Sequence, residues 1–115
     1  MTSLADLLVD ATRLLVVEGI EYDPSSRRKT RALFRDTDPA SIAQLVASLA
    51  TGPSPDDVAL MQWPSMTFVL FEGDHELARV EYLGGWLRWS GWQGDRPLIR
   101  PADLASWLTA HGLTA

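Results

Sequence analysis

Residues 66–90 constrain the fold more than any other stretch of this sequence, because strand-forming runs alternate there with short turns. The first run is the most β-favouring in the chain, and both turns contain glycine. Strands joined by connections this short pair in antiparallel fashion. The predicted strands are Met66–Glu72, Leu77–Leu83 and Trp86–Ser90, with turns at Gly73-Asp74-His75 and Gly84-Gly85. The segment is therefore predicted to form an antiparallel meander.

A first helix is predicted over residues 4–18. Ser3 is placed to cap it, Asp6 follows three residues later as in a capping box, and Gly19 is a natural C-terminal stop. Its apolar residues fall at helical spacing. However, residues 14–17 are apolar on every side, so a strand over 14–17 is the alternative prediction.

Two more helices are predicted from prolines at their first positions. Asp38 is a good N-cap for a helix that starts at Pro39. A second such helix starts at Pro101 and ends at Gly112. Each has an apolar stripe at helical spacing: Ile42, Leu45, Val46 and Leu49 in the first, and Leu104, Trp107, Leu108 and His111 in the second.

Two further strands complete the prediction. Residues 28–35 alternate between apolar and basic side chains, as in a half-buried strand, and residues 58–63 could form a short one before Pro64. The predicted fold class is α+β, an antiparallel sheet of three to five strands packed on three helices in the order α-β-α-β-β-β-α. With 115 residues and 46% apolar content, the chain is predicted to form one domain over residues 1–115.

Composition also excludes several classes of protein. Without cysteine the chain has no disulfide, thiol nucleophile or Cys-ligated zinc. Neither a basic leader with an apolar run nor an apolar window of membrane-spanning length occurs. Arginine occurs nine times and lysine once, a bias typical of GC-rich bacterial genes. A cytoplasmic bacterial protein with no membrane association is expected.

Residues that could carry catalysis are few. His75 falls in a predicted turn and His111 in the last turn of a helix, where an imidazole suits the helix dipole. The pairs Asp36/Asp38 and Asp56-Asp57 fall where helix caps and turns are expected. Phosphate-binding loops, nucleophile elbows and zinc-protease motifs are missing from the sequence. The chain is therefore predicted to be no enzyme and to bind no cofactor or metal.

A basic stretch is the first candidate surface. Residues 27–35 hold half of the ten basic residues and no acid, whereas the whole chain has a net charge of −5. These side chains suit an acidic protein surface, a phosphate, or simple protection of a sheet edge. The acidic total charge disfavours nucleic acid. The candidate residues are Arg27, Arg28, Lys29, Arg31 and Arg35.

A tryptophan cluster is the second candidate surface, since three of the five tryptophans lie between residues 86 and 92. On a strand, neighbouring side chains point to opposite faces, so one aromatic face packs on the helices and the other is available to a partner. Core packing of most of the cluster is the competing interpretation. The candidate residues are Trp86, Arg88, Trp89 and Trp92, with Arg88 available for a cation–π contact.

The segment from Phe68 to Gly112 carries a family resemblance. Its residues are the strand pair, then Leu87-Arg88-Trp89, Trp92, Gly94-Asp95, Leu98, Trp107-Leu108 and His111-Gly112. In these the chain resembles small actinobacterial proteins of unassigned chemistry. The resemblance implies an α+β fold, covers less than half of the chain and transfers no active site.

Together these features predict a non-catalytic protein-binding module of the bacterial cytosol, such as an immunity or accessory protein, present as a monomer or homodimer. The alternative is a small ligand-binding protein or hydrolase with a pocket near Trp86–Trp92. Such a pocket would need a carboxylate, for which Asp95 and Glu81 are the candidates. Nucleic-acid binding ranks third.

Overall fold

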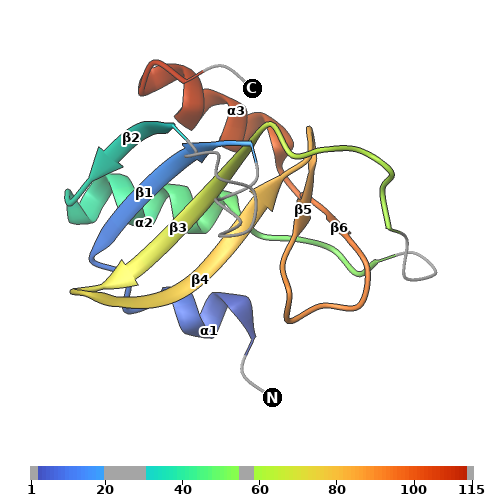
Figure 1. Cartoon of the computed structure of the whole chain (residues 1–115), viewed down its shortest axis with the longest axis horizontal. Helices are drawn as coiled ribbons and strands as arrows, with labels where there is room; N and C mark the ends of the chain where they lie inside the picture. The colour runs from blue at the N-terminus through green and yellow to red at the C-terminus, as the bar shows by residue number, and fades with distance from the viewer. Residues whose placement is uncertain (1–2, 20–30, 55–58, 114–115) are drawn as a thin grey trace.

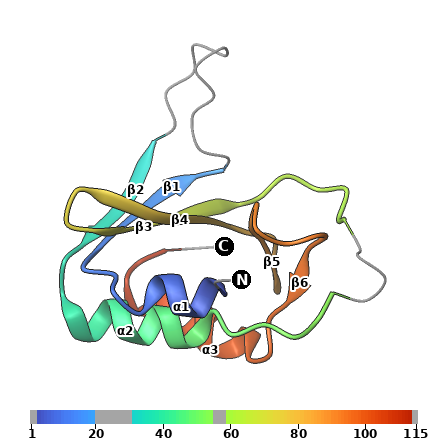
Figure 2. The ribbon, with the colours of Figure 1, turned by 90° about the horizontal axis from the view of Figure 1, so that it is seen from below.

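The chain folds into one antiparallel sheet with helices on a single face (Figure 1). The computed structural model describes residues 3–19, 31–54 and 59–113, and its sheet has six strands in the order β2-β1-β3-β4-β5-β6. Figure 2 shows all three helices beneath the sheet. The elements are α1 (Leu4–Leu8), β1 (Arg13–Glu18), β2 (Ala32–Asp36), α2 (Pro39–Ser48), β3 (Met66–Glu72), β4 (His75–Tyr82), β5 (Trp86–Arg88), β6 (Arg96–Pro97) and α3 (Pro101–Ala110).

The predicted meander is confirmed, with a shorter third strand and with β4 running from His75 to Tyr82 instead of Leu77–Leu83, so that His75 belongs to the strand and not to the turn. β3 pairs with β4 and β4 with β5, in antiparallel register throughout. The turn between β3 and β4 contains Gly73 at φ 59°, a conformation that glycine adopts at little cost. β5 ends at Arg88 instead of Ser90, because the chain turns there: the backbone N–H of Trp92 donates to the carbonyl of Trp89 at 3.0 Å.

The predicted helix over 4–18 is wrong, and the alternative strand over 14–17 is correct. α1 ends at Leu8, although Ser3 caps it as predicted and accepts the backbone N–H of Asp6 at 3.1 Å. Residues 13–18 form β1, which lies between β2 and β3. Val16 and Val17 point to opposite faces of this strand, and both are buried. Burial on both faces explains why the segment is apolar on every side.

The sheet has six strands, more than the three to five predicted, and the element order is α-β-β-α-β-β-β-β-α. β1 and the two-residue β6 are the additions. Pro97 in β6 has no N–H to donate, which restricts such a strand to a sheet edge. Of the predicted strand 28–35, residues 28–30 lie outside the described residues and β2 begins at Ala32. Residues 59–63 form no strand.

The core lies between the inner face of the sheet and the helices. Phe68 and Leu70 from β3 and Leu87 from β5 are completely buried there. The predicted stripe of α2 faces them through Ile42 and Leu45, and the helix starts as predicted, with the Asp38 carboxylate accepting the backbone N–H of Ser41. Leu104, Trp107 and Leu108 of α3 complete the core. No helix in the described ranges is long and apolar enough to cross a bilayer.

Candidate functional site

The basic stretch 27–35 lies partly beyond the described residues, since positions 27–29 fall outside them. Arg31 and Arg35 lie at β2, an edge strand of the sheet, and both are exposed. Nε of Arg31 lies 3.4 Å from Oε2 of Glu18 in an exposed ion pair. Cations at this position oppose pairing with a second strand. A contact role for the stretch stays a prediction.

The tryptophan cluster contains two rings that pack against the core and one that is half-buried on the outer face of the sheet. The rings of Trp89 and Trp92 meet edge to face, 5.6 Å apart between centroids, and both pack against the core. Trp86 is half-buried and precedes the fully buried Leu87, so it points to the outer face of the sheet. The rings of Trp89 and Trp92 therefore contribute largely to packing.

Arg88 is engaged in an ion pair and makes no cation–π contact in the described part of the chain. Its Nε and Nη2 donate to the two carboxylate oxygens of Asp95 at 2.8 and 3.0 Å. The same Nη2 donates to the carbonyl of Leu60 at 2.7 Å, and the Leu60 N–H donates to Asp95 at 2.7 Å. Asp95 is only 2% exposed. We refer to Arg88, Asp95 and Leu60 together as the clamp.

Burial and the Arg88 charge shift the pKa values of the acids around the clamp in opposite directions. Burial alone would raise the pKa of Asp95, but hydrogen bonds from Arg88 and Leu60 and the Arg88 charge lower it below its usual value. Glu81 lies 3.7 Å from Nη1 of Arg88. Burial raises the pKa of Glu81, and the Arg88 charge opposes this only in part. Asp95 is thus held ionised as a structural partner of Arg88.

The clamp fixes one end of a short exposed segment, Met61–Trp63, which the sequence reasoning did not select. Met61 is fully exposed and Trp63 is 83% exposed. Between them, Nε2 of Gln62 donates to the carbonyl of Leu83 at 2.7 Å. On the far side, the Ser65 N–H donates to the carbonyl of Tyr82 at 3.0 Å. Two large apolar side chains are therefore presented to solvent by a backbone anchored on both sides.

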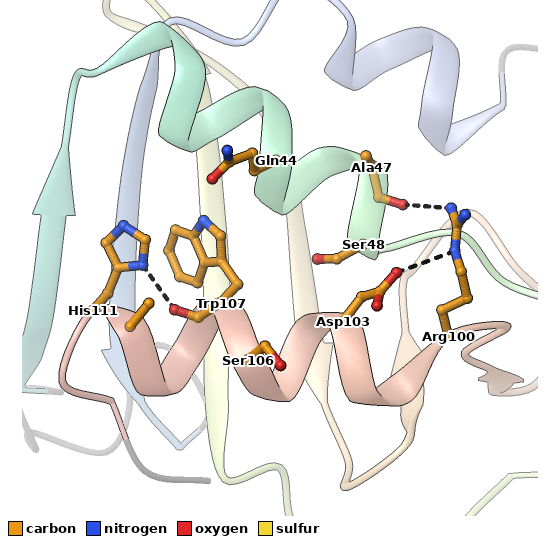
Figure 3. A pocket seen from close by; sticks show the side chains of 9 residues that line it. Gln44, Ala47, Ser48, Arg100, Asp103, Ser106, Trp107 and His111 are labelled. Atoms are coloured by element: carbon orange, nitrogen blue, oxygen red, sulfur yellow. Dashed lines mark hydrogen bonds and ion pairs between the residues drawn. The ribbon is translucent and has the colours of Figure 1, made fainter.

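A hollow of about 460 Å³ lies between α2 and α3 (Figure 3). Its walls include Trp107 and His111, whose rings stack at 4.1 Å. Nη2 of Arg100 donates a hydrogen bond to the carbonyl of Ala47 at 3.4 Å, and Nε of Arg100 lies 3.5 Å from Oδ2 of Asp103 in an ion pair. The lining residues are Gln44, Ala47, Ser48, Arg100, Asp103, Ser106, Trp107, Ala110 and His111.

His111 uses both ring nitrogens inside the fold. Nδ1 lies 2.7 Å from the carbonyl of Trp107, so this nitrogen carries the proton. Nε2 lies 2.9 Å from Oγ of Ser41. Burial alone would raise the pKa of Asp36, but hydrogen bonds from the Ser41 side chain and the loop backbone lower it. The imidazole therefore links α3 to α2, and its ring lies 5.3 Å from the Phe34 ring of β2. α3 ends at Ala110, and His111 follows it as the C-cap residue before Gly112, the predicted end.

The fold and these contacts define a small α+β domain with an exposed, anchored apolar segment. Comparison with known proteins found no matching family model, no similar curated protein and no similar solved structure. The resemblance to small actinobacterial proteins stays a prediction. Among the described residues, no group of three or more histidines and acids is arranged to hold a metal ion.

Proposed function

We propose that this chain is a non-catalytic protein-binding module of a bacterial cytoplasm, with a contact surface centred on Met61–Trp63. The observation that carries the proposal is the exposure of these two side chains on an anchored backbone. Scattered exposed apolar residues are common, so exposure by itself means little. A tryptophan on an anchored backbone differs, because little backbone conformational entropy remains to be lost on binding. Tryptophan is also enriched at interface hot spots.

The partner should offer an apolar pocket with a hydrogen-bond acceptor for the Trp63 indole N–H. It should also be basic, because the chain has a net charge of −5. Opposite net charges accelerate encounter, and that acceleration weakens as salt is added. A role as an immunity or accessory protein fits such a partner. The exposed cations of β2 remain a second candidate contact.

A hydrolase at the Trp86–Trp92 segment receives less support. A catalytic carboxylate needs an accessible oxygen and a substrate within hydrogen-bond reach. Both oxygens of Asp95 already accept hydrogen bonds from Arg88 or Leu60, and the side chain is buried. Glu81 faces the same guanidinium. Both carboxylates therefore act as ionic partners of Arg88 and not as catalytic groups.

Capture of a partner from a bacterial lysate, followed by titration of the purified partner, tests the proposal. Met61→Ala and Trp63→Ala should each weaken the purified interaction about tenfold or more, as expected for a hot spot. Ile99→Ala is the matched control, because Ile99 is a large apolar residue exposed at 61% elsewhere. A partner that binds Trp63→Ala as tightly as the unmodified protein would overturn the assignment of the surface.

Self-association is a separate outcome of the same experiment. Sedimentation equilibrium over a range of protein concentrations would detect a homodimer. If the protein forms a dimer that Trp63→Ala dissociates, the partner is a second copy of this chain. That result would exclude the basic partner protein proposed here. A single monomeric mass at all concentrations leaves a different protein as the partner.

A further inference from the structure

An apolar cavity lies on the helical side of the molecule, apart from the Met61–Trp63 segment. It has a volume of about 430 Å³, within the range of roughly 300–1,000 Å³ typical of small-molecule sites. Its walls come from α1, from the end of α2 and the residues that follow it, from Trp92 and from the first residue of β6. Most of the lining is aliphatic or aromatic, and Arg96 is the only charged residue among the described residues that line it. The main contributors are Leu4, Leu8, Val46, Leu49, Trp92 and Arg96.

The guanidinium of Arg96 has an aromatic neighbour but no anionic one in the described structure. It lies 4.7 Å from the centroid of the Trp92 ring. Its Nε is buried and has no hydrogen-bond partner. A buried donor without an acceptor costs about 1–3 kcal/mol, so such groups are rare without a reason. By contrast, Arg88 and Arg100 each contact a carboxylate.

The contact with Trp92 supplies no anionic acceptor to this guanidinium. Cζ of Arg96 lies over the Trp92 ring, 4.7 Å from its centroid, and the group carries five N–H donors in one plane. The in-plane donors match the two oxygens of a carboxylate. Because Nε is buried, a bound carboxylate would accept hydrogen bonds from the Nη donors of Arg96, while the aliphatic walls would hold the rest of the ligand.

We propose that this cavity binds a small organic monocarboxylate with an apolar chain. The single cation and the aliphatic walls distinguish this class from sugars and polyphosphates, which need several polar partners. The proposal stands on the geometry of Arg96, Trp92 and the cavity. It is independent of the protein-binding surface, because neither Met61 nor Trp63 lines the cavity.

Titration of the full chain with octanoate, followed by NMR of the tryptophan indole and arginine Nε signals, tests this site. Saturable shifts at Trp92 and Arg96 are expected. Octanol has the same chain without the anion and should bind about tenfold more weakly or worse, a loss of about 1.4 kcal/mol. Octanol that binds as well as octanoate, or octanoate that produces no saturable shift, would overturn the proposal.

Variants separate the site from general surface binding. Arg96→Gln should reduce octanoate affinity about tenfold, whereas Arg100→Gln, at an exposed arginine outside the cavity, should leave it unchanged. Val46→Phe fills the cavity and keeps the charge, so it should also block binding. Thermal melts establish that each variant is folded before titration. Octanoate affinity that survives both Arg96→Gln and Val46→Phe would locate the ligand elsewhere and refute the site.

Discussion

The indole ring of Trp89 lies so close to the α-carbon of Gly91 that no side chain fits at residue 91. A β-carbon there would lie 2.7 Å from ring atom Cζ2 and closer still to two other ring carbons. The same turn ends β5 and brings Trp92 edge to face with Trp89. The glycine therefore allows both rings to pack against the core.

We expect Gly91→Ala to lower the free energy of unfolding by about 1–3 kcal/mol, the usual cost of overpacking. Gly91 has an ordinary backbone conformation, so the collision with the Trp89 ring is the cause. Urea unfolding measures the effect. In a Trp89→Ala background the ring is gone, and Gly91→Ala should then cost much less. An equal cost in both backgrounds would contradict this explanation.

Trp63 should dominate the quenchable fluorescence of the protein. It is 83% exposed, whereas Trp107 is 5% exposed and donates its indole N–H to the Ser41 carbonyl at 3.0 Å. Trp63→Phe should remove most of the iodide-accessible signal and change stability by about 0.5 kcal/mol or less. Trp107→Ala, a core truncation, should cost about 3–5 kcal/mol. Strong iodide quenching that survives Trp63→Phe would contradict this expectation and would show that the half-buried Trp86, Trp89 or Trp92 supplies the accessible signal instead.

Asp95→Asn should weaken both the fold and the anchoring of the exposed segment. Removing one charge of a largely buried pair costs up to about 3–5 kcal/mol, and the partial exposure of Arg88 brings our expectation to about 2–3 kcal/mol. Hydrogen exchange at the Leu60 amide should accelerate beyond this global effect, because its acceptor is altered. Asp103→Asn, at an exposed ion pair, is the control and should cost less than about 1 kcal/mol.

Stability should pass through a maximum in mild acid. Because burial raises the pKa of Glu81, the folded state takes up a proton more readily than the unfolded state, and stability rises as the pH falls through that pKa. The pKa values of Asp36 and Asp95 are lowered in the folded state, so these two carboxylates stabilise the fold when they are ionised. That stabilisation is lost below about pH 4, as the pH falls through their pKa values in the folded state. Urea midpoints at several pH values measure the curve. Glu81→Gln should abolish the rise and keep the acid loss.

Local patterns predicted the elements whose signals lie within a few residues. The Asp38-Pro39 start of α2 and the Gly73-Asp74 turn between β3 and β4 depend on near neighbours in sequence. The start of α2 is predicted correctly, and the turn is placed correctly but is one residue shorter than the predicted Gly73-Asp74-His75. β1 was first predicted as helix because residues 14–17 have no periodicity that separates a doubly buried strand from a buried helix. Its pairing with β2 and β3 on both sides decides the outcome.

The site residues were harder to predict, because tertiary contacts determine their roles. Arg88 was selected as a contact residue, and only the folded chain brings Asp95 and Leu60 to its guanidinium. Trp63 stands in the sequence like any core tryptophan, and its exposure follows from the anchoring of its neighbours. Arg96 carries no distinguishing signal in the sequence, and only the fold shows that its Nε has no hydrogen-bond partner and that its guanidinium lies over Trp92.

The strand order has a consequence for how the chain reaches this structure. Four of the five strand pairings join strands that are consecutive in the chain, and the pairing of β1 with β3 is the exception. Consecutive pairings close short loops and form early, whereas pairings across long separations slow folding. We therefore expect the β1–β3 pairing, from Arg13↔Phe71 to Glu18↔Met66, to form after the pairings between consecutive strands. Its formation, across a segment that includes α2, is expected to limit the folding rate.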